Sequence, residues 1–359
     1  MMSWFFFVLA CSSQDVPPTS AGPALNSEMV TNDEPASTDE SGSNSDIDAL
    51  RALGYVDYAP DDTDGRDGLV EMDEERSFPG VTVLASRPNR TADLVSHTGE
   101  IIHSWSSRDT VGRWVRARLL EDGGLLVVGK GEEGPGESRY LVRLDANSEE
   151  VWRRPLAIHH EVALGPDGGW LTLELVYRII EEVHPEIPIR DDRILFLDSD
   201  GERVRSFSLY DGLSQSGVGI TPVQAYEGDS GMMIDIFHSN SLFWMDLVIS
   251  RLQTASSHSV YAPGGVLICI RHQNRVAVLD SLTGAVRWTW GTEFLSGPHD
   301  ATLLDNGNIL IFDNGLGHGR SRVLEVDPRT NQIVWQYQAS NPEEFYSASR
   351  GSAQRLPNG

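Results

Sequence analysis

Short apolar runs alternate with turns along the chain from about residue 78 onward. In residues 301–312, two apolar runs flank the turn Asp305-Asn306-Gly307-Asn308. Asn-Gly and Asp-Gly between apolar runs are strong β-hairpin signals, because the central residues of such turns adopt positive φ. The same hairpin pattern occurs, whole or in part, at four other places: residues 117–128, 162–173, 261–268 and 354–359.

A second hairpin belongs to each unit, so that a unit of about 45–50 residues supplies four short strands. Its copies are residues 92–105, 140–152, 194–207, 276–288 and 323–335. Four antiparallel strands per repeat make one blade of a β-propeller. We therefore predict an all-β propeller over residues 78–359. A tryptophan recurs in the fourth strand and is expected to pack between blades: Trp105, Trp152, Trp288 and Trp335.

The repeat occurs five times and begins a sixth time. The last residues, Pro357-Asn358-Gly359, fall at the tip of a hairpin whose second strand does not follow. We therefore expect the chain to be a fragment or a misassigned reading frame, and its last blade to be incomplete.

The first residues resemble a bacterial lipoprotein signal. An apolar run at residues 4–10 ends in Leu9-Ala10-Cys11 and is too short to span a bilayer as a helix. Residues 1–11 are therefore expected to act as a signal whose cleavage leaves Cys11 acylated, in the periplasm or on the outer membrane. An ordinary cleaved signal peptide is the alternative. Residues 12–77 are acidic and rich in Ser, Pro and Asp, which is typical of a disordered tether.

Acidic side chains outnumber basic ones, with 53 Asp and Glu against 28 Lys and Arg and a net charge of −25. Such a surface repels nucleic acid and anionic headgroups, so any membrane contact is expected through the N-terminal lipid only. The second cysteine, Cys269, lies in an apolar run at residues 266–270. That context is typical of a buried thiol, and two cysteines cannot build a disulfide framework.

Histidines fall at equivalent places in two units. Gly169 and Asn308 hold the same position of the hairpin turn, and their offset of 139 residues carries His160 onto His299. Each histidine heads the innermost strand of its blade, which faces the central channel. We therefore expect two imidazoles to share the axial space. His159 points to the other face of its strand, and which of His159 and His160 faces the site stays open.

A third unit contributes His238, in the segment His238-Ser239-Asn240-Ser241. His238 lies 27 residues before Gly265 instead of nine, which indicates an insertion at about residues 243–260, acting as a lid or a packing element. Arg271 ends the second strand of this unit and is expected at the same rim. Three histidines and an arginine at blade heads favour a functional site over isolated structural histidines.

Four segments together resemble the bacterial arylsulfotransferases: His159-His160-Glu161, His238-Ser239-Asn240-Ser241, Ile270-Arg271-His272-Gln273-Asn274, and residues 299–308 continuing through Phe312-Asp313-Asn314-Gly315. The resemblance covers roughly residues 78–359. It implies a six-bladed propeller of four-stranded antiparallel blades. It also implies an enzyme that moves a sulfuryl group from an aryl sulfate to a phenol, without a nucleotide sulfate or other cofactor.

The resemblance also assigns roles to residues. His299 is the histidine that becomes transiently sulfated. A neutral imidazole can attack directly, and the planar fork of an arginine matches an oxyanion. The groups expected to hold and polarise the sulfuryl oxygens are His160, His238, Asn240 and Arg271, and His160 is a candidate to protonate the departing phenolate. His159 and Asp300 are further candidate substrate contacts, and Asp300 or a backbone carbonyl is expected to orient the ring of His299.

Two alternatives remain. A non-catalytic cell-surface propeller that binds a protein or glycan would have the same fold, but it would not need three histidines and an arginine to converge. Three histidines can also ligate zinc. The fixed positive charge of Arg271 would repel a cation, so we expect no metal at this site.

Overall fold

The structure is a computed structural model that describes residue 69 and residues 72–86, 89–109, 112–131, 138–228, 231–252 and 258–359. The expected signal, Cys11 and most of the expected tether lie outside the described residues. All described residues belong to one compact unit. Nowhere within them is there a helix of the length and apolarity needed to cross a membrane.

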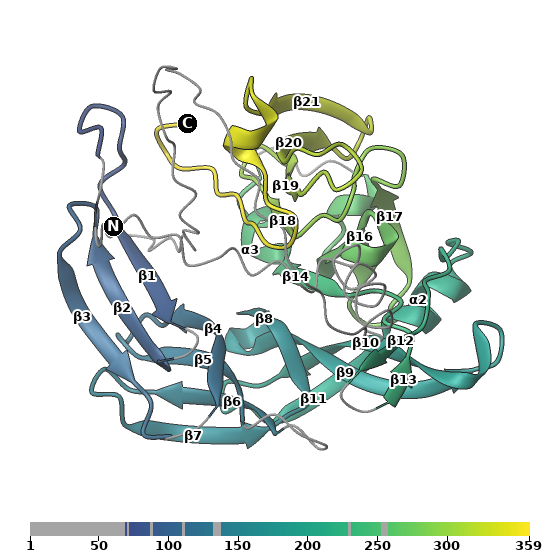
Figure 1. The fold of residues 1–359 in the computed structure, drawn as a ribbon, viewed down its shortest axis with the longest axis horizontal. Coiled ribbons are helices and arrows are strands. Elements are labelled where there is room, and N and C mark those ends of the chain that lie inside the picture. Colours follow the sequence, from purple (N-terminus) through teal and green to yellow (C-terminus); the bar gives the residue numbers. More distant parts are fainter. Residues whose placement is uncertain are drawn as a thin grey trace, which may run out of the picture. The chain divides into compact units, whose positions relative to one another are not determined.

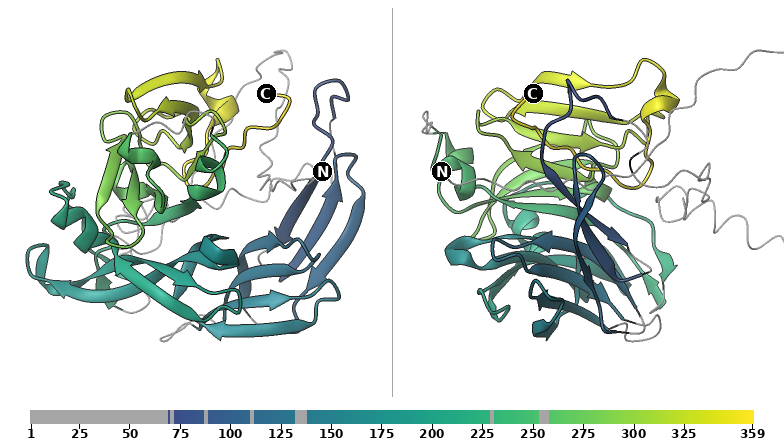
Figure 2. Two further views of the ribbon diagram at one scale, coloured as in Figure 1. Left: turned by 180° about the vertical axis from the view of Figure 1, so that it is seen from behind. Right: turned by 90° about the vertical axis from the view of Figure 1, so that its left-hand side faces the viewer.

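Antiparallel sheets build this unit, and successive sheets follow one another along the chain (Figures 1 and 2). Four sheets have four strands each, connected as simple meanders. Their strands are β4 (Arg113–Leu119), β5 (Leu125–Lys130), β6 (Arg139–Leu144) and β7 (Glu150–Pro155); β8 (Ile158–Leu164), β9 (Trp170–Ile180), β10 (His184–Leu197) and β11 (Arg203–Ser208); β14 (Ser239–Trp244), β15 (Gly265–Ile270), β16 (Arg275–Asp280) and β17 (Val286–Trp290); and β18 (Asp300–Leu303), β19 (Ile309–Asp313), β20 (Arg322–Asp327) and β21 (Gln332–Tyr337).

A fifth sheet has only three strands, β1 (Val81–Ser86), β2 (Thr91–Ser96) and β3 (Ile101–Ser106). The described chain is therefore a β-propeller of five blades, and the prediction of six blades was wrong. A sixth blade would need its own set of paired strands, but residues 350–359 form no strand at all. The remaining elements lie in connections between strands: β12 (Tyr226–Gly228), β13 (Gly231–Met233), α2 (Leu209–Gln215), α3 (Asp246–Ile249), and the short 3-10 helices η1 (Pro166–Gly168), η2 (Ser259–Tyr261), η3 (Arg271–Gln273) and η4 (Pro342–Phe345).

The predicted turn between β18 and β19 forms as the sequence indicates. Gly307 has φ of +88°, a conformation that glycine adopts without steric cost. The amide of Gly307 donates to the carbonyl of Leu304 at 2.8 Å, and the amide of Leu304 donates to Asn308 at 2.8 Å. These bonds fix the register of the hairpin, which starts β18 directly after His299.

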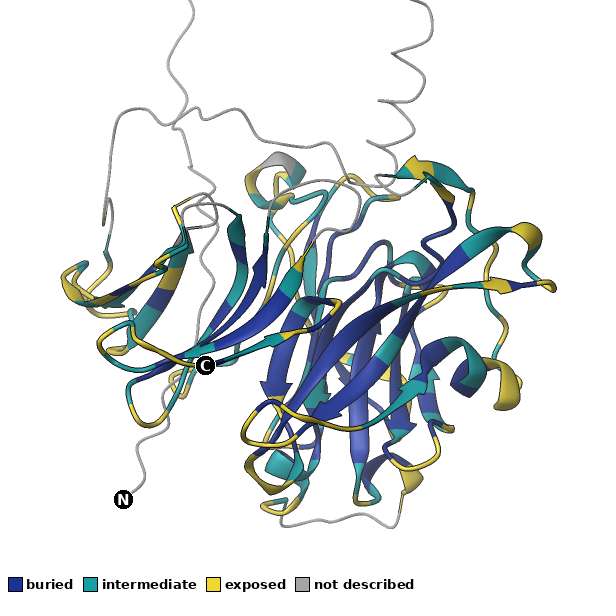
Figure 3. Cartoon of the chain, turned by 90° about the horizontal axis from the view of Figure 1, so that it is seen from below, coloured by how far each residue is buried: buried dark blue, intermediate teal, exposed yellow. Residues whose placement is uncertain are grey.

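Apolar clusters lie between neighbouring sheets, and the buried residues run along the strands while the turns are exposed (Figure 3). One cluster joins β1–β3 to β4–β7 and another joins β4–β7 to β8–β11. Two more join β8–β11 to β14–β17 and β14–β17 to β18–β21. Trp105, Trp152 and Trp288 belong to these clusters as predicted, but Trp335 is 40% exposed.

The insertion at residues 243–260 is a packing element in its described part. Trp244, Met245, Val248 and Val260 are buried and contribute to the clusters on either side of the β14–β17 sheet. Cys269 is a fully buried free cysteine, in agreement with the sequence.

The innermost strands are interrupted at the same place in three blades. The pairing register shifts between Trp114 and Arg116 in β4, between His159 and Val162 in β8, and between Ser239 and Ser241 in β14. Such bulges twist a strand and redirect its side chains, and they are frequent beside active sites. They place the heads of the inner strands where the predicted histidines lie.

Candidate active site

The structure brings together histidines from separate blades. The rings of His160, in β8, and His238, which precedes β14, lie 5.0 Å apart with an interplanar angle of 67°. His272, in η3, stacks on His238 at 4.8 Å and 29°. Burial is the largest cause that lowers the pKa of His160 well below its usual value, and positive charge at His159, His238 or His299 acts in the same direction. His299 therefore belongs to the same electrostatic cluster.

Two of these histidines have an unusual backbone. His160 has φ of +56° and His238 has φ of +46°. Residues other than glycine in this left-handed region cost on the order of 1–3 kcal/mol each, and such strain collects at functional sites. We infer that the fold keeps His160 and His238 in these strained conformations because they direct the two imidazoles towards each other.

His299 lies directly before β18, and its backbone amide donates to the carbonyl of Phe312 at 3.0 Å. Its Nδ1 lies 2.6 Å from Oδ1 of Asn314 and 3.2 Å from the carbonyl oxygen of Gly297. Burial, followed by the positive charge of Arg271, lowers the pKa of His299 to about 4. The ring is therefore neutral at pH 7, which is the state that a nitrogen nucleophile requires.

Asp300 does not orient this ring, contrary to one of the two expectations from the sequence. Its Oδ2 accepts a hydrogen bond from the backbone amide of Ala353 at 3.2 Å. Burial raises the pKa of Asp300 to about 6. Asn314 and the Gly297 carbonyl instead hold His299, which agrees with the other expectation, a backbone carbonyl.

Arg271 is 3% exposed and begins η3 at the end of β15. Its Nη1 lies 3.1 Å from Nε2 of His272. A Cβ placed on Gly297 would lie 3.9 Å from Nε of Arg271, so the guanidinium passes close to the segment that carries His299. Asn240 is also buried and donates from Nδ2 to the carbonyl of Pro298 at 3.3 Å. Two of the four groups predicted to hold the sulfuryl oxygens, Asn240 and Arg271, are thus next to the His299 segment.

The position of His159 does not match its predicted role as a substrate contact. It is 2% exposed, its Nε2 lies 3.1 Å from Asp192, and its Nδ1 lies 3.0 Å from Nη2 of Arg190 and 2.6 Å from Nδ1 of His160. Both ring nitrogens therefore face protein groups. We assign His159 to the support of His160, in place of the substrate contact that the sequence suggested.

A buried network of charged side chains contacts the histidine cluster. Arg190 and Asp192 come from β10, and Asp235 comes from the segment before His238. Arg190 donates to Asp235 at 2.9 Å, and Nδ1 of His238 lies 2.6 Å from the same carboxylate oxygen. The amide of Ser239 donates to Asp192 at 2.8 Å, which ties β14 to the neighbouring blade.

Arg190, Asp192 and Asp235 are not among the site residues predicted from the sequence. The sequence did contain a signal, because four consecutive charged residues, Arg190-Asp191-Asp192-Arg193, directly precede the apolar run Ile194-Leu195-Phe196-Leu197. Charges in a buried strand are costly unless they are paired, so they often mark a site. The pattern has no counterpart in the other repeats, and the comparison of repeats therefore did not find it.

One cluster in the described part of the chain has the side chains of a metal site: Asp235, His238 and His272 offer ligand atoms within 4.8 Å of one another. Asp235 is already paired with Arg190 at 2.9 Å. Arg271 approaches His272 from the other side. Two fixed positive charges at these distances oppose a cation, so the donor set does not fit a metal ion.

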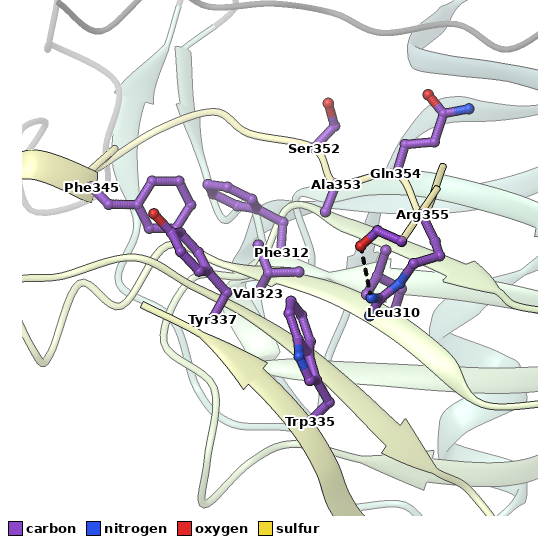
Figure 4. A pocket seen from close by; sticks show the side chains of 11 residues that line it. Leu310, Phe312, Val323, Trp335, Tyr337, Phe345, Ser352, Ala353, Gln354 and Arg355 are labelled. Atoms are coloured by element: carbon purple, nitrogen blue, oxygen red, sulfur yellow. Dashed lines mark hydrogen bonds between the residues drawn. The ribbon is translucent and has the colours of Figure 1, made fainter. Parts of the chain in front are cut away.

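A separate hollow of about 290 Å³ lies on the face of β19–β21, lined by Leu310, Phe312, Trp335, Tyr337 and the segment from Ser352 to Arg355, among others (Figure 4). Arg355 reaches across it and donates to the carbonyl of Gly359 at 3.5 Å. None of the predicted catalytic residues lines this hollow.

No curated protein matches the sequence. A protein of unknown function from Bacteroides caccae is similar in structure, with 14% identity, a TM-score of 0.40, and coverage of 73% of this chain and 82% of that chain. The β-propeller domain of Myceliophteria thermophila Cps50 (Swd1) is similar with 12% identity, a TM-score of 0.39, and coverage of 76% and 73%. The family model "Arylsulfotransferase (ASST)" matches residues 116–359, which include every predicted catalytic residue, and the chain therefore belongs to the arylsulfotransferase family.

Proposed function

We propose that this protein transfers a sulfuryl group from an aryl sulfate to a phenol through a sulfohistidine at His299, without a nucleotide sulfate. The observation that carries the proposal is the meeting of His160 and His238 from adjacent blades with His299 and Arg271 close by. Membership of the arylsulfotransferase family supports the reaction class.

In the first half-reaction, a ring nitrogen of His299 attacks sulfur in line with the aryl oxygen. A nitrogen–sulfur bond forms, the sulfur–oxygen bond to the aryl group breaks, and the electron pair leaves on the phenolate oxygen. The lowered pKa of His299, about 4, keeps its lone pair available at pH 7. A covalent intermediate divides one difficult displacement into two easier ones.

The charge of the sulfuryl oxygens must be held while the attacking and leaving atoms stay in line, as in phosphoryl transfer. Arg271 supplies a buried, permanent positive charge beside the His299 segment. Asn240 supplies an amide next to Pro298, the residue before His299. Each such preorganised donor is worth roughly 10²–10³ in rate when it addresses developing charge.

In the second half-reaction, the oxygen of the acceptor phenol attacks the sulfur of sulfohistidine and the nitrogen–sulfur bond breaks. The acceptor loses its proton to a base, and His160 is the group we assign to this step. Burial and neighbouring positive charge lower the pKa of His160, so its ring is unprotonated at pH 7 and can accept the proton, and the resulting imidazolium is a strong acid. The same proton can then pass to the phenolate that leaves in the next cycle. His160 thus acts as base and acid in turn.

The test is turnover of 4-nitrophenyl sulfate with a phenol acceptor by the whole chain and by His299→Asn. We expect release of 4-nitrophenol that depends on the acceptor and is abolished in the variant. His97→Asn is the matched control, because His97 is exposed in the turn between β2 and β3. Equal release by wild type and His299→Asn, or no release by the wild type, contradicts the proposal and favours a binding propeller.

The lipid anchor on Cys11 is a separate proposal that rests on the sequence Leu9-Ala10-Cys11. It predicts that the mature protein in a bacterial host partitions with detergent and incorporates labelled fatty acid. Cys11→Ser is expected to lose both properties. Labelling that persists in the variant would contradict the anchor.

A further inference from the structure

The Nδ1 atom of His299 faces two oxygens. It lies 2.6 Å from Oδ1 of Asn314 and 3.2 Å from the carbonyl oxygen of Gly297. A backbone carbonyl can only accept a hydrogen bond, so Nδ1 has to be the donor. A neutral imidazole carries one N–H proton, and the two oxygens of Gly297 and Asn314 indicate that this proton is on Nδ1.

The orientation of the Asn314 amide is fixed by a second pair of carbonyls. Its Nδ2 lies 2.7 Å from the carbonyl oxygen of Ser347 and 2.7 Å from that of Arg350. Both carbonyls can only accept, so both hydrogens of Nδ2 are used and Oδ1 must face His299. Asn314 is fully buried, so water cannot replace these bonds if the amide turns over.

The turn that follows η4 supplies the two carbonyls and is itself tied down. The amide of Ser347 donates to Oγ of Ser321 at 2.9 Å, and Oγ of Ser347 donates to the carbonyl of Arg350 at 2.8 Å. Residues 347–350 are therefore held against the blade that contains β18–β21. Through Asn314 this turn reaches the ring of His299.

We propose that Asn314 is a positioning residue that keeps the proton of His299 on Nδ1, so that Nε2 is the nitrogen that attacks sulfur. The proposal rests on the proposed function and specifies its nucleophilic atom. The Nε2 lone pair forms the new bond to sulfur, and the electron pair of the breaking sulfur–oxygen bond leaves on the aryl oxygen. No proton needs to leave His299 in this step.

The same hydrogen bond supports the reaction as it proceeds. When Nε2 binds sulfur, the imidazole ring becomes positively charged, and its Nδ1–H becomes a stronger donor. The Asn314 oxygen is already 2.6 Å away. The contact is therefore stronger in the transition state than in the ground state, which is the condition for an interaction to accelerate the step.

The experiment has a spectroscopic part that needs no substrate. In protein labelled with ¹⁵N-histidine, protonated and unprotonated ring nitrogens resonate at well separated positions, and His299→Asn identifies the signals. We expect His299 of the wild type to be protonated at Nδ1 and unprotonated at Nε2. In Asn314→Ala, the signals should shift towards a mixture of both tautomers, and the rate of the first nitrophenol release should fall roughly 10- to 100-fold.

Asn308→Ala is the matched control. Asn308 lies in the hairpin turn of the same sheet, and its Nδ2 donates to Glu325 at 2.7 Å, so the variant loses a comparable side-chain bond without touching His299. Thermal unfolding of both variants separates a general loss of stability from an effect on the ring. Asn308→Ala should leave the tautomer and the rate unchanged.

Asn314→Asp is the second variant: one carboxyl oxygen still accepts from Nδ1 of His299, while the other loses the donor that Nδ2 gave to the carbonyls of Ser347 and Arg350, so its thermal unfolding is measured as well. It should keep the proton on Nδ1, and its negative charge should raise the pKa of His299, so that activity is lost at a higher pH on the acid side than in the wild type. A purely structural role would not move the pH profile in this way.

Protonation of wild-type His299 at Nε2, or an unchanged tautomer and rate in Asn314→Ala, would overturn the proposal. The expected tautomers without any turnover of aryl sulfates would overturn the proposed function and leave the position of the proton established.

Discussion

Oδ2 of Asp235 lies 2.6 Å from Nδ1 of His238, and both side chains are shielded from solvent. The carboxylate is also 2.9 Å from Arg190 of the neighbouring blade. Asp235 therefore compensates a buried positive charge and orients an imidazole at the same time. Its pKa is held well below the usual value, despite burial, by Arg190 and His238.

Replacement of Asp235 by Asn should destabilise the fold strongly. The variant leaves Arg190 buried without its full countercharge, and the removal of one partner from a buried pair costs about 3–5 kcal/mol. Urea unfolding of Asp235→Asn is the measurement. Asp305→Asn is the control, because Asp305 pairs with Arg251 at an exposed site and should change the free energy of unfolding by less than about 0.5 kcal/mol. Equal effects would show that the buried network adds no stability.

Replacement of Arg271 by Met should move the acid limb of the pH profile upward. Only unprotonated His299 can attack, so kcat/KM in the wild type should fall as the pH falls through about 4, the pKa of His299. Arg271 contributes to that low value, so its removal raises the pKa and activity is lost at a higher pH. The rate at neutral pH should also fall roughly 10²–10³-fold. Arg251→Met, at an exposed position, should retain the wild-type profile; an unshifted limb in Arg271→Met would contradict the arrangement.

Replacement of His160 by Gly should separate stability from activity. Glycine adopts the φ of +56° without strain, so part of the cost of removing the side chain is offset. Val115 lies in the corresponding bulge of β4 and does not have positive φ. Val115→Gly should therefore lose more free energy of unfolding than His160→Gly, yet retain turnover, whereas His160→Gly should lose roughly 10²-fold in kcat or more.

Replacement of Asp300 by Asn should stabilise the protein at neutral pH. Burial raises the pKa of Asp300 to about 6, so ionisation opposes folding once the pH exceeds the unfolded value of about 4. The stability gained by the variant should be absent below pH 4, grow between about pH 4 and 6, and stay constant above that. Denaturant unfolding across this pH range measures it. The Asn oxygen can still accept from Ala353, so a gain that does not depend on pH would point to another cause.

The sequence predicted the propeller and much of the site because both depend on repetition. The offset of 139 residues between Gly169 and Asn308 placed His160 and His299 at equivalent blade heads. The Asp-Gly and Asn-Gly dipeptides predicted where the inner hairpins turn, because turn formation depends on residues that are adjacent in sequence. The number of blades depends on which strands pair over long distances, and local patterns did not show that the first sheet has three strands.

The supporting residues were not predictable in the same way. Asp235 and Arg190 belong to segments that differ from the other repeats, and their partnership spans 45 residues. Asn314 follows β19 as Arg271 follows β15, but its bonds to Ser347 and Arg350 depend on how residues 347–350 fold back against this blade. Contacts of this kind are set by the tertiary structure and leave no periodic signal.

The apolar layers between consecutive sheets have a consequence for substrate choice. The imidazoles of His160, His238 and His299 belong to three different blades, so the separation of these rings follows the angle at which one blade rests on the next. Exchanging a methyl group for an ethyl group deep in such a layer would tilt a blade and widen or narrow the gap that a donor's ring must enter. Under the proposed function, selectivity among sulfate esters can therefore change at positions that never touch a substrate.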